Sequence, residues 1–453
     1  MSSLEEKIKD FVHSQGIAVV GVSGKERLDG PPSLDPTYTL PGARSIVSMA
    51  MPMDVPAIYD FLSKKSPVPH NIDQLIGNQK LHHIAVRVAD HIRSLGYEAR
   101  AVPSNNTYRR SPDIFATHPS FSHRFGAIAS GIGAQGWSGN VMTKEYGAAV
   151  YLGTVVTSAE LESDPQLPPR YFIDGYCRTC QVCSHSCPAR MFEAEGEEYV
   201  LVNGALHPRA RRRDIDFCNA SCFGLHGLSM DRKWSSWGRH WISGWVEREP
   251  DPAKESIRAT LMRKGSSVGD STVRYDLIRS IAAELHPEDW IDEHKIVPRL
   301  EDLPADELEC RKLQSSMIKQ CLGIDIADPN VLTCGQCALV CGPDIKESAK
   351  RLTYLREGGI VVRGKDDRYV AVKTFEEAQA IRDQYPFRIA RSAQLKDMLS
   401  STLMWIRLYG GIEPKSVIRG LLYDRKLKKA VRQRVYGHAE YVNRTRDEHA
   451  AIS

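Results

Sequence analysis

One run of cysteines constrains this chain more than any other feature of its sequence. The run is Cys177-Arg-Thr-Cys180-Gln-Val-Cys183-Ser-His-Ser-Cys187-Pro188. The spacing C-x2-C-x2-C-x3-C-P is typical of chains that wrap a [4Fe-4S] cluster and direct the fourth cysteine to a second cluster. It therefore predicts another set of cysteines, and the sequence supplies one at Cys334, Cys337 and Cys341, followed by Gly342-Pro343.

Structural zinc is the main alternative for paired cysteines, because two C-x2-C pairs can form one tetrahedral site. Two longer runs, each with a proline close behind its last cysteine, fit a single tetrahedron poorly. The chain holds 11 cysteines in 453 residues. In a reducing compartment, metal ligation explains such a number better than disulfides do. We predict two [4Fe-4S] clusters.

Two such clusters require four thiolates each, one more than the two runs supply. By the pattern of two-cluster ferredoxins, Cys341 is the fourth ligand beside Cys177, Cys180 and Cys183, and Cys187 joins Cys334 and Cys337. We prefer Cys218 as the eighth ligand because it ends an apolar segment soon after Cys187, and Cys222 is the close competitor. Cys310 and Cys321 lie in polar surroundings and are expected to be ordinary buried thiols.

Composition and charge limit the class of protein. The 60 Lys and Arg residues nearly balance the 56 Asp and Glu residues, and the net charge of +4 does not by itself indicate nucleic-acid binding. The N-terminus has no twin arginine and no apolar signal core. No segment approaches the roughly 20 apolar residues that span a bilayer. We therefore expect a cytoplasmic protein without a membrane span.

Hydrophobic periodicity predicts an α+β fold. A helix at 4–14 and a buried strand at 17–22 suggest the opening of an α/β unit. Further elements are expected as strands at 45–51, 97–103, 148–157 and 199–202, helices at 74–96 and 122–130, and short strands at 360–363 and 369–372. We predict an α/β domain at 1–165, a cluster domain at 166–350 with an insert at about 224–330, and a mainly helical region at 351–453.

Two further segments are open to more than one interpretation. Four tryptophans at 234, 237, 241 and 245 have helical spacing, and an aromatic face packed into a domain interface is favoured over a ligand platform. Residues 415–434 form a basic amphipathic segment, which is usually a solvated helix face. The more specific alternative is that this segment binds RNA, a membrane surface or an acidic partner.

The segment Gly131-Ile-Gly133-Ala-Gln-Gly136 matches GxGxxG. A dinucleotide-binding fold requires a strand before these glycines and a helix after them. Residues 122–130 are predicted to be helical and residues 148–157 to be a strand, so we reject that interpretation. The glycines instead suit close approach of the backbone to a large flat group.

Taken together, these motifs resemble the superfamily of cobalamin-dependent epoxyqueuosine reductases and reductive dehalogenases. The resemblance covers about residues 4–222 and 331–343. It rests on the opening LEEKIKDFVHSQGIAVVGV, on Pro41-Gly-Ala-Arg-Ser45, on the block from Gly131 to Gly147 that matches GLGxxG…SGN…T-x-E-[YF]-G, on TSAELESDP, and on the cysteine runs. It implies a corrinoid held by the N-terminal domain and lined by Gly131, Gly133, Gly136, Ser138, Asn140, Tyr146 and Gly147.

The chain departs from this family at two places. Epoxyqueuosine reductases carry an Asp proton donor upstream of the glycine block, where this chain has Thr117-His118, and reductive dehalogenases use a Tyr with a basic neighbour, as in Tyr108-Arg109. The candidate donors are therefore His118, Tyr108 and His123, since a histidine that titrates near neutrality suits proton delivery. The C-terminus also lacks the periodic helical repeat that helps the tRNA enzyme hold its substrate.

We expect a reductase that passes electrons from an external low-potential donor, such as ferredoxin or flavodoxin, through two [4Fe-4S] clusters to a corrinoid. The expected substrate is a small organic molecule. The alternatives are an epoxyqueuosine reductase-like enzyme acting on tRNA and an electron-transfer protein without corrinoid.

Overall fold

The computed structural model describes residues 3–103, 119–213, 218, 221, 227–238, 335–365 and 368–385. These residues fall into two compact units, one combining residues up to 212 with 335–359, and the other combining 213–238 with 360–385. Several predictions concern residues outside the described ranges: Tyr108, His118, Cys222, Cys310, Cys321, Cys334, Trp241, Trp245 and the basic segment 415–434.

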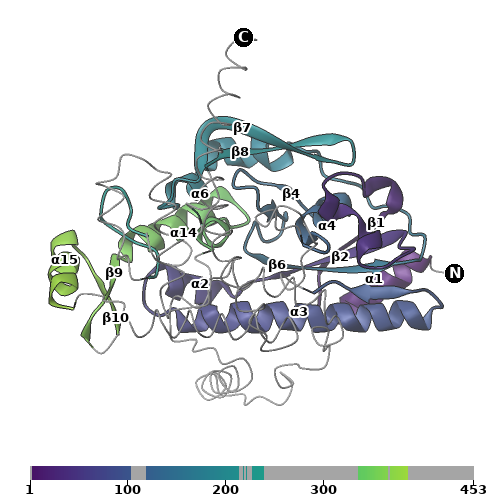
Figure 1. Ribbon diagram of the computed structural model, residues 1–453, viewed down its shortest axis with the longest axis horizontal. Coiled ribbons are helices and arrows are strands. Elements are labelled where there is room, and N and C mark those ends of the chain that lie inside the picture. The colour runs from purple at the N-terminus through teal and green to yellow at the C-terminus, as the bar shows by residue number, and fades with distance from the viewer. Residues whose placement is uncertain are drawn as a thin grey trace, which may run out of the picture. The chain divides into compact units, whose positions relative to one another are not determined.

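A four-stranded sheet forms the centre of the first unit (Figure 1). Its strands are β1 (Val19–Gly24), β2 (Ser45–Pro52), β3 (Ala99–Ala101) and β6 (Val150–Thr157). Their order is β1-β2-β6-β3, and each neighbouring pair is antiparallel. In the middle of the sheet Val47 of β2 lies opposite Val22 of β1 and Val155 of β6.

The antiparallel sheet confirms a mixed helix-and-strand fold but corrects the expected α/β opening. In an α/β unit a crossover helix returns the chain to a parallel strand. Here β1 and β2 are antiparallel neighbours, and the segment between them contains only short 3-10 turns at Lys25–Arg27, Pro32–Leu34 and Pro36–Tyr38. The helix and strand that open the chain are present. The connection from β1 to the antiparallel β2, however, is typical of an α+β arrangement.

Helices cover both faces of this sheet. On one face α1 (Leu4–Ser14) and α3 (Val68–Ser94) bury Ile8, Leu81 and Val88 against Val47 and Val155. On the other face α4 (His123–Ala129) packs Ile128 with Ile46 and Val156, and Val200 and Val202 of a strand hairpin join this core. Helix α2 (Val55–Leu62) precedes α3. The cysteine runs are therefore attached to a conventional three-layer core.

Helix α3 begins earlier than the predicted residue 74. Pro69 lies in its first turn, where proline is well tolerated. The first turns also bury His70 and Asn71, two polar residues that conceal the helix from a search for apolar periodicity. The ring of His70 is 1% exposed and lies 4.6 Å from the ring of Phe61, centroid to centroid.

His70 should make the fold sensitive to acid. Burial lowers the pKa of His70 to about 4, so between pH 6.5 and pH 4 the unfolded chain binds a proton that the folded chain excludes. Stability is therefore lost as the pH falls through this window. Denaturant unfolding at pH 7.5 and pH 5 should show a loss about 2 kcal/mol smaller for His70→Leu than for the wild type. His83→Gln, which changes an exposed histidine of the same helix, should lose as much as the wild type; equal losses in all three proteins would contradict this account.

The remaining elements of the first unit surround the cysteines. Two short strands, β4 (Ala134–Gln135) and β5 (Val141–Met142), flank a tight turn within the glycine block. The first cysteine run follows a π-helical turn at Ile173–Cys177 and forms α5 (Arg178–Cys180) and α6 (Val182–His185). The hairpin of β7 (Phe192–Val202) and β8 (Ala205–Arg212) comes next. The second run leads into α13 (Gln336–Leu339) and α14 (Ile345–Glu357).

Two of these observations bear directly on the sequence predictions. The helix before the glycines and the strand after them are confirmed, so the rejection of a dinucleotide fold stands. Strand β8 was not predicted, because it carries the basic run at Arg209 and Arg211–Arg212. Glu198 of β7 accepts hydrogen bonds from Arg209 and Arg212, which explains how a strand tolerates such a run.

The second unit contains the predicted strand pair, β9 (Ile360–Arg363) and β10 (Tyr369–Val372), followed by α15 (Phe375–Gln384). Its core packs Leu228 against Ile360, Val362 and Ala378. Trp234 and Trp237 are buried, but residues 227–238 contain no helix, so helical spacing was misleading for this pair. Within the described residues, no helix combines the length and apolar character needed to cross a membrane.

Candidate iron–sulfur centre

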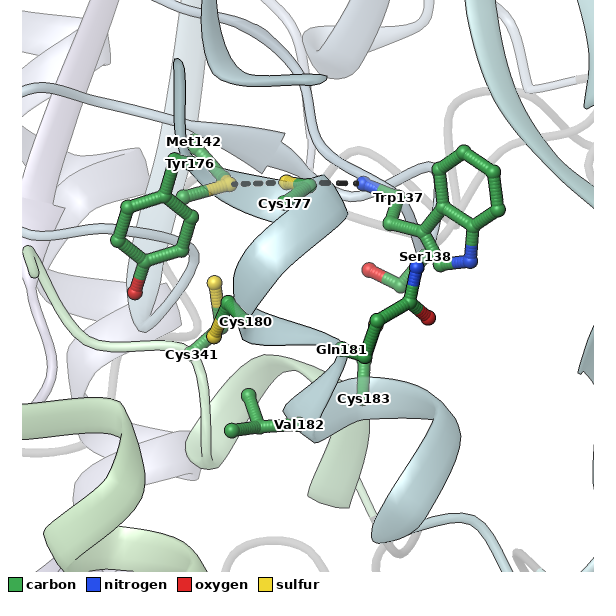
Figure 2. Close-up of a pocket in the computed structure, with 10 residues that line it drawn as sticks. All are labelled: Trp137, Ser138, Met142, Tyr176, Cys177, Cys180, Gln181, Val182, Cys183 and Cys341. Atoms are coloured by element: carbon green, nitrogen blue, oxygen red, sulfur yellow. Dashed lines mark hydrogen bonds between the residues drawn. The ribbon is translucent and has the colours of Figure 1, made fainter. Parts of the chain in front are cut away.

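Four cysteines from the two runs line one pocket, which we call the four-thiol pocket (Figure 2). Cys177, Cys180 and Cys183 reach it from the first run, and Cys341 reaches it from the loop after α13. The rest of its lining comes from the glycine block and from the neighbours of the first run, namely Trp137, Ser138, Met142, Tyr176, Gln181 and Val182. Residues far apart in the sequence thus meet in the combination that the ferredoxin pattern predicts.

Local backbone geometry brings the first three thiols together. Gln181 has a left-handed conformation with φ of 50°, and it separates α5 from α6. This reversal follows Cys180 and precedes Cys183, so both side chains turn toward the same space. Cys341 is fixed from the other side, because its carbonyl oxygen accepts a hydrogen bond of 3.1 Å from the Ala148 amide.

The pocket is dry. Cys177, Cys183 and Cys341 are buried and share a hydrophobic cluster with Trp137 and Phe172. Burial raises the pKa of Cys177 to about 12 and also raises the pKa of the Cys183 and Cys341 thiols. Neighbouring cysteines raise these pKa values further, so without a metal the thiols stay protonated. Binding of iron would release those protons and supply the positive charge that these three buried thiolates require.

Two groups favour negative charge on the sulfur atoms of this pocket. The Trp137 amide donates to Cys177 Sγ at 3.4 Å, which lowers the pKa of Cys177 against the effect of burial. The Arg351 guanidinium, almost fully buried, donates to the Leu339 carbonyl oxygen at 3.0 Å and pairs with Glu347 at 2.8 Å. Its charge opposes the rise in the pKa of Cys341. Both features suit thiolate ligands.

Among the described residues, no three His, Cys, Asp or Glu side chains lie close enough to ligate a single ion. A cubane cluster spreads its four ligands over four iron atoms. The residues of the four-thiol pocket fit a cluster by their chemistry, their burial and their N–H donor to sulfur.

The other predicted ligands lie in different places. Cys187 is half-buried just after α6, and Cys337 is half-buried in α13, where its sulfur accepts a hydrogen bond from Asn140 Nδ2 at 3.4 Å. Cys218 belongs to the second unit and is half-buried. Cys334 lies outside the described residues. The assignment of these four cysteines to a second cluster stays a prediction.

The glycine block packs on protein atoms at each position expected to face a corrin. A methyl group on Gly131 would overlap the Pro165 carbonyl oxygen, and one on Gly133 or Gly136 would meet Met142 at 2.6 Å. Gly147 lies against the backbone of Gly342. Ser138 lines the four-thiol pocket, Asn140 contacts Cys337, and the Tyr146 amide donates to Thr143 Oγ1. The described block therefore presents no open cradle at its glycines.

Of the three candidate proton donors, only His123 is described. It is the first residue of α4, and its Nδ1 lies 2.9 Å from Thr154 Oγ1. Burial lowers the pKa of His123 to about 4. In the folded chain this imidazole is neutral at pH 7, so it cannot act as an imidazolium acid toward a substrate. Tyr108 and His118 remain predictions.

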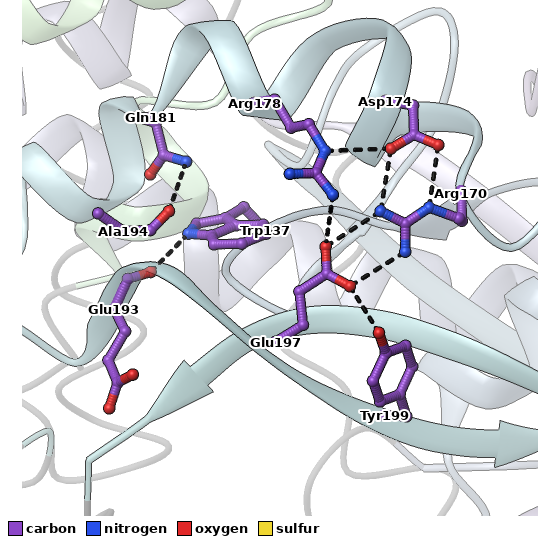
Figure 3. A network of polar contacts seen from close by, with 9 residues as sticks. All are labelled: Trp137, Arg170, Asp174, Arg178, Gln181, Glu193, Ala194, Glu197 and Tyr199. Atoms are coloured by element: carbon purple, nitrogen blue, oxygen red, sulfur yellow. Dashed lines mark hydrogen bonds and ion pairs between the residues drawn. The ribbon is translucent and has the colours of Figure 1, made fainter. Parts of the chain in front are cut away.

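A network of ion pairs, not predicted from the sequence, ties the first cysteine run to the β7–β8 hairpin (Figure 3). Glu197 of β7 accepts from Arg170 at 3.0 Å and from Arg178 at 2.9 Å, and Asp174 pairs with both arginines. Hydrogen bonds from Arg170 lower the pKa of Glu197. Arg178 lies between Cys177 and Cys180. This position inside the cysteine run was the only sign in the sequence that Arg178 takes part in such a network. Such a network holds the cysteine loop in register.

The comparisons with known proteins identify two groups of enzymes. No protein-family model matches the chain. A tetrachloroethene reductive dehalogenase of Dehalobacter restrictus is 28% identical over 118 residues, which cover 26% of this chain and 18% of that protein. An epoxyqueuosine reductase of Gloeobacter violaceus is 26% identical over 178 residues, which cover 38% of this chain and 49% of that protein. This chain is a relative of both groups of reductases.

The solved structure of epoxyqueuosine reductase from Bacillus subtilis aligns with 92% of our chain. The alignment covers 97% of the Bacillus protein, at 15% identity and a TM-score of 0.34. The sequence similarity to the two curated relatives confirms the resemblance found in the motifs. The chain described here spans about a fifth of the length of the dehalogenase and about half of the length of the epoxyqueuosine reductase. The activity, substrate and partners of this chain are therefore proposals.

Proposed function

We propose that this chain is an oxidoreductase that carries two [4Fe-4S] clusters and passes electrons through them to a corrinoid, which serves the reduction of a small organic substrate. The observation that carries the proposal is the four-thiol pocket, in which Cys341 completes a set begun by Cys177, Cys180 and Cys183. The similarity to two groups of reductases supports a reductive role for it.

Bound clusters would supply one-electron transfer. The chain contributes the ligands, the apolar surroundings and the charge. Trp137 and Phe172 pack in the hydrophobic cluster that holds Cys177, and the Trp137 amide stabilises negative charge on Cys177. Arg351 places a buried cation near Cys341. In the second cluster, Cys187, Cys218, Cys334 and Cys337 would serve as ligands.

The corrinoid rests on the resemblance of the sequence motifs. The glycines expected to line it, Gly131, Gly133, Gly136 and Gly147, pack on protein atoms. The same resemblance places Ser138, Asn140 and Tyr146 at the corrin. Tyr108 and His118 remain proposed proton donors, with an external ferredoxin or flavodoxin as the proposed source of electrons.

Cobalamin uptake by the full chain tests this function. Protein prepared anaerobically with iron, sulfide and hydroxocobalamin should retain about one cobalt per two clusters after gel filtration. With a low-potential reductant it should release halide from a panel of haloaromatic compounds, and omission of cobalamin should abolish that release. Clusters without retained cobalt would instead favour the electron-transfer alternative.

The same preparation distinguishes the tRNA alternative. Binding of bulk tRNA that weakens steeply with added salt, together with no halide release, would favour an epoxyqueuosine reductase-like enzyme over the dehalogenase-like one. Phosphate contacts make nucleic-acid binding salt-dependent, whereas uptake of a small organic substrate has no such dependence. The proposal expects little tRNA retention at physiological salt.

A further inference from the structure

A tight turn in the glycine block lies between the two cysteine runs. It comprises Trp137, Ser138, Gly139 and Asn140 and joins β4 to β5. Two backbone hydrogen bonds close it, from the Gly136 amide to the Asn140 carbonyl oxygen and from the Gly139 amide to the Gly136 carbonyl oxygen, both 2.9 Å long. We call it the 137–140 turn.

This turn donates a hydrogen bond to one sulfur of each run. At one end the Trp137 amide lies 3.4 Å from Cys177 Sγ, as Figure 2 shows. At the other end Asn140 Nδ2 lies 3.4 Å from Cys337 Sγ. Both lengths fall within the usual range for bonds to sulfur, which is a larger acceptor than oxygen. A single short turn therefore contacts a proposed ligand of each cluster.

The turn is held rigidly from behind. The Trp137 indole is 2% exposed and donates through Nε1 to the Glu193 carbonyl oxygen at 3.0 Å. The Ala210 amide donates to the Trp137 carbonyl oxygen at 2.8 Å. Asn140 Nδ2 also donates to Ser138 Oγ at 3.1 Å, which orients the amide. The β7–β8 hairpin thus keeps the Trp137 donor in place before any cluster binds, and Ser138 orients the Asn140 donor.

We propose that the 137–140 turn sets the reduction potentials of the two clusters separately, the Trp137 amide acting on the cluster of Cys177 and the Asn140 side chain on the cluster of Cys337. Reduction adds negative charge to a cluster and its sulfur ligands. An N–H donor to a ligand sulfur stabilises that charge and raises the potential. Asn140 is thereby a positioning residue for electron transfer, an inference that rests on the proposed function because it needs assembled clusters.

This role differs from the one the family resemblance implies for Asn140. A corrin-lining amide would direct its donors toward the macrocycle, whereas here the side-chain nitrogen contacts Ser138 and Cys337. The two roles predict different changes when the donor is removed. Loss of a corrin contact weakens cobalamin retention, while loss of the sulfur contact lowers the potential of one cluster.

A redox titration followed by electron paramagnetic resonance tests the inference on the full chain, reconstituted anaerobically with iron and sulfide and without cobalamin. Asn140→Leu removes the donor at similar size. Reduction of one cluster should become about tenfold less favourable, which lowers its midpoint by about 59 mV, and the other midpoint should stay unchanged. The cluster that shifts should be the one lost in Cys337→Ala. The same substitution on α3, Asn78→Leu, should shift neither midpoint.

Asn140→Asp provides a second variant if the leucine protein assembles clusters poorly, because it keeps the shape and replaces the donor with an acceptor. It should also lower the midpoint of the Cys337 cluster alone. Unchanged midpoints in either variant, or equal shifts of both clusters, would overturn the inference while leaving the proposed function intact. A wild-type chain that assembles no clusters would overturn the proposed function itself.

Discussion

Gly147→Ala should abolish assembly of the cluster in the four-thiol pocket and destabilise the fold by about 2–5 kcal/mol. Gly147 has φ of +67°, and a methyl group there would overlap the carbonyl oxygen of Gly342 and lie 2.6 Å from that of Cys341. Since both neighbours are backbone atoms, they cannot move aside as a flexible side chain would. The loop that presents Cys341 would be displaced from the other three thiols.

Gly16→Ala is the matched control for this prediction. Gly16 has φ of +82°, similar to that of Gly147, but a methyl group there would have no atom within 4 Å. The two variants therefore share the backbone strain and differ in the overlap. Iron content and denaturant unfolding should show full iron and a loss of about 1 kcal/mol for Gly16→Ala. Equal iron content in the two variants would contradict the packing of the glycine block on the Cys341 loop.

Pairs of cysteine substitutions should show which thiols share a cluster. Cys177→Ala and Cys341→Ala should each remove one cluster, leaving about four of about eight iron atoms per chain. The double variant Cys177→Ala/Cys341→Ala should lose no more than either single variant, because both residues line the same pocket. The double variant Cys177→Ala/Cys337→Ala should retain almost no iron.

The control for this series is Cys310→Ala, which changes a cysteine outside both runs and should keep all the iron. Far-ultraviolet circular dichroism would verify that each variant retains its helices. If Cys177→Ala/Cys341→Ala lost almost all its iron, as Cys177→Ala/Cys337→Ala is expected to do, Cys341 would belong with its own run. The prediction that Cys341 shares a cluster with the first three cysteines would then be wrong.

The sequence predicted the elements with strong periodicity or strong motifs. Helix α1, strands β2 and β6 and the pair β9–β10 lie close to their expected positions because their apolar residues repeat regularly. The spacing C-x2-C-x2-C-x3-C-P also led to the prediction that Cys341 lies with the first three cysteines, which line one pocket with it. The clusters themselves stay a prediction.

Other features depend on contacts that no local pattern encodes. The antiparallel pairing of β1 and β2 is decided by the connection between them, and the first turns of α3 bury His70 and Asn71 instead of apolar residues. Glu198 neutralises the arginines that concealed β8. Around the site, the contact of Asn140 with Cys337 joins residues 197 positions apart. Such pairs become evident only in the folded chain.

The presence of two clusters can be decided from the iron and acid-labile sulfide content of the anaerobically reconstituted full chain, together with its electron paramagnetic resonance spectrum after reduction. We expect about eight iron and about eight sulfide per chain, with the signals of two reduced [4Fe-4S] clusters that interact. One tightly bound zinc with no labile sulfide, or about four iron in a single cluster, would contradict it.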